Sequence, residues 1–169
     1  MNEKRMTRFL KLLEGANYKS VVLNPGPTMT YLTGLHFGLD ERPKMLFLGK
    51  NIEPVLILPE LEAGSLDNAS FKVKPFVYGE NPEQWLKVFK EACDYLQLDG
   101  QTIGVEPVHL RVLELNFLQG AAPKSKFVSA SAQLDFLRMQ KDEEEIAAMR
   151  KAARIAQNAF QSTISSIKA

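Results

Sequence analysis

Over the first fifteen residues, apolar side chains recur at intervals of three and four, the spacing of a helix that buries one face. The same spacing predicts a helix over residues 81–98, with Asn81 as its N-cap and Pro82 at its first helical position. A further helix is expected over residues 107–120. Shorter helices are expected over residues 28–34, 59–69 and 131–138.

Short apolar runs, many of them β-branched, separate these helices and predict strands. They lie at residues 21–23, 44–50, 53–60, 71–79, 101–106 and 126–130. The second and third runs are close enough for an antiparallel hairpin, whereas most other connections are long enough to hold a helix. This alternation predicts an α/β domain of three layers, with helices on both faces of a mixed, mostly parallel central sheet.

The last quarter of the chain predicts one long amphipathic helix. Asp142 is a suitable N-cap, and Glu145 three residues later completes a capping box. An apolar stripe then runs along the helix through Ile146, Met149, Ala153, Ala156, Phe160 and Ile164. A stripe of this length needs a partner surface, which lies either on the same domain or on another part of a larger assembly.

Composition restricts the class of protein. The chain has 169 residues, of which 45% are hydrophobic and 24% charged, as in an ordinary globular domain. Its 21 basic and 20 acidic residues are scattered, so no basic region indicates binding to nucleic acid or to an anionic membrane. Without a membrane-length apolar run or a signal-peptide pattern, we expect a cytoplasmic location, which the single cysteine, Cys93, also favours. Cys93 lies on an apolar helix face, so we expect a buried, unreactive thiol.

Motifs for chemistry are mostly absent. The sequence has no phosphate-binding glycine loop and no nucleophile elbow, and its two histidines, His36 and His109, lie in no metal-binding motif. We therefore assign no catalytic residue and no metal ligand, and His109 is expected in the first turn of the helix at 107–120. The loop at 36–44 is more informative, because His36, Asp40, Glu41 and Arg42 crowd into it. It is either a solvated loop with a local ion pair or a site that presents polar groups to a partner.

Two stretches of the sequence resemble the N-terminal domain of the creatinase and prolidase family, which includes Xaa-Pro dipeptidases and aminopeptidases. The first, NPGPTMTYLTGLHFGLDERPKMLFLG, contains Asn24 in a turn and the Tyr-Leu-Thr-Gly element at 31–34. The second, FVSASAQLDFLRMQKDEEEIAAMRKAARIAQNAF, contains Arg138, Lys141 and the Glu-Ile pair at 145–146 before an alanine-rich helix. The two stretches occur in the family's order, so the resemblance covers nearly the whole chain.

The resemblance implies a ribonuclease H-like N-terminal domain at residues 1–136. Residues 137–169 would then be a linker and the first helix of a catalytic domain whose remainder is absent from this sequence. In the family, that domain holds two divalent metal ions, such as Mn, Co or Zn, through two aspartates, a histidine and two glutamates. We therefore expect this chain to carry no cofactor and no peptidase activity of its own, although the parent protein would be a metallopeptidase.

The resemblance also implies a role for the domain. Such domains assemble a homodimer and shape the active-site entrance, while proline-containing peptides bind through the catalytic domain. Asp40, Glu41 and Arg42 would form the entrance loop, with His36 as a weaker candidate because the dipeptidase branch has its histidine between the acidic residues. The alternative is a stand-alone protein-interaction module or a non-catalytic homologue with the same fold.

Overall fold

The protein is described by a computed structural model that covers residues 3–18, 20–69 and 71–167. The chain forms two compact units, Met1–Leu137 and Arg138–Ala169, and each is described here by itself.

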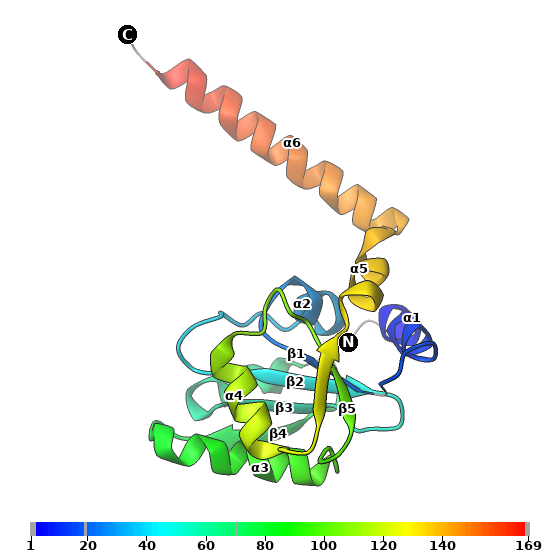
Figure 1. The fold of residues 1–169 in the computed structure, drawn as a ribbon. Helices are drawn as coiled ribbons and strands as arrows, with labels where there is room; N and C mark the ends of the chain where they lie inside the picture. The colour runs from blue at the N-terminus through cyan, green and yellow to red at the C-terminus, as the bar shows by residue number, and fades with distance from the viewer. Residues whose placement is uncertain (1–2, 19, 70, 168–169) are drawn as a thin grey trace. The chain divides into compact units, whose positions relative to one another are not determined.

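A sheet with the strand order β4-β3-β2-β1-β5-β6 is the centre of the first unit (Figure 1). In the described sheet, β2 pairs antiparallel with both β1 and β3, whereas the other three strand pairs are parallel. The predicted hairpin and the mixed, mostly parallel sheet are therefore confirmed. The strands are β1 (Ser20–Leu23), β2 (Met45–Gly49), β3 (Val55–Pro59), β4 (Lys74–Tyr78), β5 (Thr102–Val105) and β6 (Lys126–Ser129).

Helices cover both faces of this sheet, which confirms the three layers (Figure 1). Alternate side chains of β1 point to opposite faces, so Leu23 packs in one core and Val22 in the other. The core around Leu23 includes side chains from α1 (Glu3–Leu13), α2 (Pro27–Thr33) and α5 (Ser131–Met139). The core around Val22 includes side chains from α3 (Trp85–Tyr95) and α4 (Val112–Ala121).

Three helix predictions need correction. The segment expected as a helix from Pro59 is the 3-10 helix η1 (Glu60–Asn68), and Pro59 itself ends β3. A short 3-10 helix, η2 (Pro82–Gln84), precedes α3, although the Asn81 side chain caps it by accepting a hydrogen bond from the Glu83 N–H.

The third correction concerns α4, which begins at Val112 instead of residue 107. Residues 107–109 form a turn in which the Glu106 carbonyl accepts hydrogen bonds from the N–H groups of His109 and Leu110. At the start of the helix, the Arg111 N–H donates to Glu114 Oε2 at 3.2 Å, and the Arg111 guanidinium pairs with the same carboxylate. His109 is therefore not in the first helical turn, as expected, but in the turn before it.

The direction of β2 brings the charged loop to one edge of the sheet. Because β2 runs opposite to the other described strands, its first residue meets the ends of the remaining five. We call this the carboxyl edge. The segments that meet there are 24–26, 36–44, 60–62, 79–80, 106–111 and 130–131. Ligands of open α/β sheets bind at the corresponding edge.

The second unit consists mainly of α6 (Glu143–Ser166). Its predicted capping box is present, because Asp142 Oδ1 accepts from the Glu145 N–H at 2.8 Å and Glu145 Oε2 accepts from the Asp142 N–H at 2.9 Å. The apolar stripe is exposed at Ile146, Met149 and Phe160. Among the residues that the structure describes, no helix is long and apolar enough to cross a membrane.

Candidate functional site

A buried lysine is at the centre of the charged loop. Lys44 directly precedes β2, and its side chain is 0% exposed. Its Nζ donates to both carboxylate oxygens of Asp40 at 2.9 and 2.8 Å and to the Gly38 carbonyl at 3.1 Å. Glu62 Oε1, from η1, lies 2.8 Å from the same ammonium group. A buried ammonium is tolerated only when it is paired and hydrogen-bonded in this way, so these contacts hold the loop against the sheet.

Asp40 makes further contacts besides its ion pair with Lys44. Its Oδ1 also accepts from the Arg42 backbone N–H at 3.0 Å, and its carbonyl accepts from the guanidinium of Arg111. Partial burial acts to raise the pKa of Asp40. The hydrogen bonds from Lys44 and Arg42, together with their charges, outweigh that effect and leave the pKa of Asp40 lowered. Asp40 is therefore held as a carboxylate.

Arg42 is engaged by two carboxylates. Its Nη1 lies 3.0 Å from Glu41 Oε1. Its Nη2 lies 2.7 Å from Oε2 of Glu80, a residue that closely follows β4 in the chain. The hydrogen bond and charge of Glu80 raise the pKa of Arg42, and Glu41 adds to the effect. The side chains of Glu41 and Glu80 are 77% and 67% exposed, whereas that of Arg42 is 28% exposed. The acidic groups therefore face solvent more openly than the guanidinium does.

Two residues from other elements complete the support. The buried Tyr78, at the end of β4, donates its hydroxyl to the Pro43 carbonyl at 2.7 Å, and burial raises the pKa of this phenol. Arg111 donates to the Asp40 carbonyl while it pairs with Glu114, whose side chain is fully buried at the start of α4. Together with Glu62 of η1, these residues anchor the loop to three separate elements, so the loop is preformed.

The structure brings three of the four predicted site residues together and leaves one apart. Asp40, Glu41 and Arg42 belong to one ion-pair network, whereas His36 is exposed and makes no hydrogen bond or ion pair with the described residues. The sequence analysis did not identify the residues that support the loop. These are Lys44, Glu62, Tyr78, Glu80 and Arg111. Only Lys44 offered a local signal, as a lysine four residues after Asp40 that directly precedes a wholly apolar strand.

Glu106 and His109 form a second polar cluster at the carboxyl edge. Glu106 is 4% exposed, and its Oε1 accepts a hydrogen bond from the Thr28 hydroxyl. His109 Nδ1 lies 3.6 Å from that oxygen, which is too long for a hydrogen bond. Among the described residues, Glu106 Oε2 and His109 Nδ1 have no hydrogen-bond partner, and no group of three or more His, Cys, Asp or Glu is placed to hold a metal ion. We assign no metal to this pair.

Comparisons with known proteins agree with the fold. The chain is 25% identical over 162 residues to the Xaa-Pro dipeptidase of Lactobacillus helveticus, a match that covers 95% of this chain and 43% of that protein. A solved dipeptidase from Pyrococcus horikoshii OT3 matches with a TM-score of 0.81 at 25% identity, over 95% of this chain and 44% of the other. The chain thus spans less than half the length of these relatives.

A solved fragment matches this chain along the fragment's whole length. It is the creatinase/prolidase N-terminal domain of an X-Pro dipeptidase from Streptococcus pyogenes, with a TM-score of 0.68 and 24% identity, over 80% of this chain and 99% of the fragment. At this identity the match shows the fold alone. The sequence pattern of the creatinase/prolidase N-terminal domain itself matches residues 5–140. The chain therefore belongs to the creatinase/prolidase N-terminal domain family.

Proposed function

We propose that this chain is the non-catalytic N-terminal domain of a longer, metal-dependent Xaa-Pro dipeptidase-like protein. In this proposal the domain contributes to a homodimer, and its loop at 36–44 shapes the entrance of an active site. Hydrolysis of proline-containing peptides, and the two divalent metal ions that it requires, belong to a catalytic domain of which α6 is the first helix.

The anchored loop carries this proposal. Five of its groups are held from within or by neighbouring elements, namely the carbonyls of Gly38, Asp40 and Pro43, the Asp40 carboxylate and the Arg42 N–H. A preformed loop loses little conformational entropy when it meets a substrate or a neighbouring subunit. Its position at the carboxyl edge is also the usual position of ligand sites in open α/β sheets.

The apolar surface near the loop supports a role in assembly. Leu39, Leu61, Val108 and Val112 all belong to the segments at the carboxyl edge or directly follow them, and all four are exposed. Leu61, Val108 and Val112 are each more than 70% exposed. Exposed apolar side chains along one edge of a domain are candidates for a surface that contacts another protein.

The coding sequence beyond Ala169 provides the first test. An in-frame continuation with two aspartates, one histidine and two glutamates in that order is expected, and a natural stop codon would instead support the stand-alone module. The longer protein should cleave Xaa-Pro dipeptides in the presence of manganese, whereas purified residues 1–169 should not. Turnover by residues 1–169 alone would contradict the assignment of catalysis to another domain.

The proposed assembly surface is tested separately in the longer protein. Val108→Asp combined with Val112→Asp should shift the dimer towards monomer in size-exclusion chromatography with light scattering. The control Lys90→Asp also introduces an acidic side chain, but on an exposed position of α3. If the protein remains a dimer with all of these changes, the carboxyl edge is not part of the dimer interface.

A further inference from the structure

Strand β6 has an open outer side. The strand order makes β4 and β6 the two outer strands of the described sheet (Figure 1). Among the described elements, β6 packs extensively along β5 alone, whereas β4 also contacts α3 and η1. In β6, Phe127 and Val128 are half-buried, while Lys126 and Ser129 are exposed. An uncovered edge strand is a template on which a further strand can pair.

Two residues of β6 direct their backbone groups away from β5. The N–H groups of Lys126 and Ala130 donate to the carbonyl just before β5 and to the last carbonyl of β5, at 2.9 and 2.8 Å. Because successive strand residues alternate in direction, the N–H and C=O groups of Phe127 and Ser129 point to the open side. Within the described part of the chain, these groups have no backbone partner there. The edge therefore offers two donors and two acceptors.

The opposite edge of the sheet is protected. The Lys74 N–H donates to the Pro54 carbonyl beside β3, so Pro75 and Val77 are the residues of β4 that face outward. Pro75 has no N–H to donate, and a proline on an edge strand hinders the addition of another strand. Since β6 contains no proline, one edge of the sheet blocks strand addition and the other permits it.

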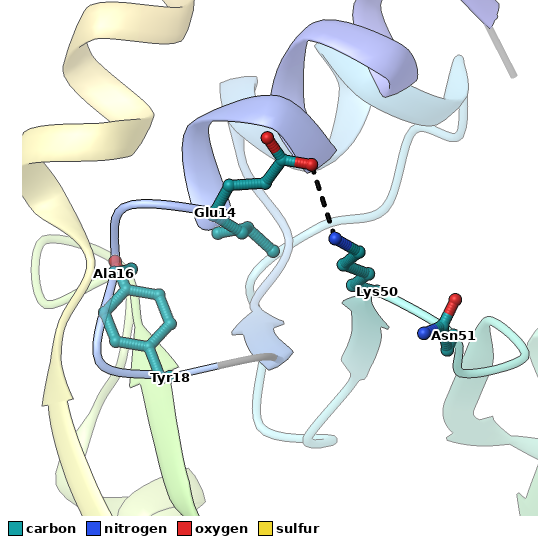
Figure 2. A pocket seen from close by; sticks show the side chains of 6 residues that line it. Glu14, Ala16, Tyr18, Lys50 and Asn51 are labelled. Atoms are coloured by element: carbon teal, nitrogen blue, oxygen red, sulfur yellow. Dashed lines mark hydrogen bonds and ion pairs between the residues drawn. The ribbon is translucent and has the colours of Figure 1, made fainter.

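The open edge is held in position by the core. Figure 2 shows the Tyr18 ring beside β5, where it packs against Gly104. The Tyr18 hydroxyl donates to Gln133 Oε1 at 2.7 Å, and Gln133 belongs to α5, which begins just after β6. This contact fixes the end of β6 against β5. A preformed edge loses little conformational entropy when another strand pairs with it.

The edge of β6 is complementary to a second copy of itself. In an antiparallel pair centred on Val128, Phe127 of each copy lies opposite Ser129 of the other. Each such pair of residues exchanges two hydrogen bonds, so every outward group of the edge is satisfied. Lys126 lies opposite Ala130, so no like charges meet. We infer that two copies of this chain join through β6 into one continuous sheet, and the two-fold axis closes the assembly as a dimer.

A disulfide across the two-fold axis tests this arrangement in residues 1–169. The two copies of Val128 would form a non-hydrogen-bonded pair with Cα atoms about 4.5 Å apart, a distance that a disulfide bridges. Oxidation of Val128→Cys should therefore convert most of the chain to a disulfide-linked dimer on a non-reducing gel. Val77→Cys, 39% exposed on the protected edge, is the matched control and should remain monomeric. The buried Cys93 does not compete for oxidation. Equal cross-linking of both variants, or of neither, would overturn the inference.

Hydrogen exchange of the unmodified chain provides a second readout. The amides of Phe127 and Ser129 should exchange about tenfold more slowly at ~1 mM protein than at ~10 μM, because pairing protects them. The outward amide of Val77 should show no such change. Val108→Asp combined with Val112→Asp should preserve the protection, since neither residue belongs to β6, so this inference and the proposed function can fail separately. Exchange that does not depend on concentration, or protection that the double variant removes, would contradict pairing through β6.

Discussion

Lys44 and Asp40 form an ion pair in which the ammonium is completely buried while the carboxylate is still 40% exposed. The cation is thus withdrawn beneath the loop, and acidic groups form its outer surface. A second carboxylate, that of Glu62, contacts the same ammonium and is 27% exposed. The pairing explains how a loop rich in charge is attached to an apolar sheet, because the lysine satisfies its hydrogen bonds inside the loop.

Replacement of Lys44 by methionine should destabilise the first unit. The change leaves Asp40 and Glu62 without their cation, but both carboxylates reach solvent, so we expect a loss of about 1–3 kcal/mol in the free energy of unfolding. Urea denaturation followed by circular dichroism measures it. The control Lys50→Met removes a half-exposed partner of Glu14 and should cost about 0–1 kcal/mol. Equal losses for the two variants would contradict the structural role of Lys44.

The lowered pKa of Asp40 predicts a pH dependence of stability. A carboxyl group whose pKa is lower in the folded state stabilises that state above its unfolded pKa. This stabilisation is lost as the pH falls below the ordinary value of 3.8 towards the folded pKa. The stability difference between wild type and Asp40→Asn should therefore be constant near neutrality and shrink below about pH 4. Denaturation curves from pH 7 to pH 3 measure it, with Asp135→Asn, on an exposed position of α5, as the control.

Arg42 should affect substrate affinity in the longer protein more than it affects folding. If Arg42 leaves Glu41 or Glu80 to pair with a peptide carboxylate, Arg42→Ala should raise KM about tenfold and change kcat little. Steady-state kinetics with Xaa-Pro dipeptides test this, and unfolding of the variant should remain close to wild type. Arg42→Lys is the informative companion, because it keeps the charge but not the bidentate geometry. An unchanged KM for both variants would contradict the proposed role of Arg42 at an active-site entrance.

Gly104 should tolerate no side chain. A Cβ atom built at Gly104 lies 2.6 Å from the buried Tyr18 ring, which the hydrogen bond to Gln133 holds in position. Gly104→Ala should therefore lower the free energy of unfolding by about 1–3 kcal/mol. Gly15→Ala is the control, because a Cβ atom at Gly15 meets nothing within 4 Å. Similar stability of both variants in chemical denaturation would show that Tyr18 moves freely.

The thiol of Cys93 should be inert in the folded protein. It is 1% exposed in the core around Val22, and burial raises its pKa to about 12, so it is protonated at neutral pH. Ellman's reagent should label it only as the protein unfolds, and the labelling rate should increase with urea concentration. Since Cys93 is the only cysteine in the sequence, the signal has one source. Rapid labelling of the native protein would contradict the observed burial.

Local patterns in the sequence determined most of the architecture. The period of three and four predicted α1 and α3, the short apolar runs predicted all six strands, and Asp142 with Glu145 predicted the start of α6. These features depend on residues that are neighbours in the chain, so local sequence is sufficient. The prediction failed at the start of α4, which is delayed to Val112 by the turn at 107–109 and by the pairing of Arg111 with Glu114.

The sequence by itself determined the family, the layered α/β fold and the position of the loop that contains Asp40, Glu41 and Arg42. Only the tertiary structure decided what those residues contact, because Glu80 lies 38 positions from Arg42 and Arg111 lies 71 positions from Asp40. The antiparallel direction of β2 brings Lys44 to the edge where the other strands end. The pairing of charges there depends on the strand order across the sheet, which no local pattern of residues encodes.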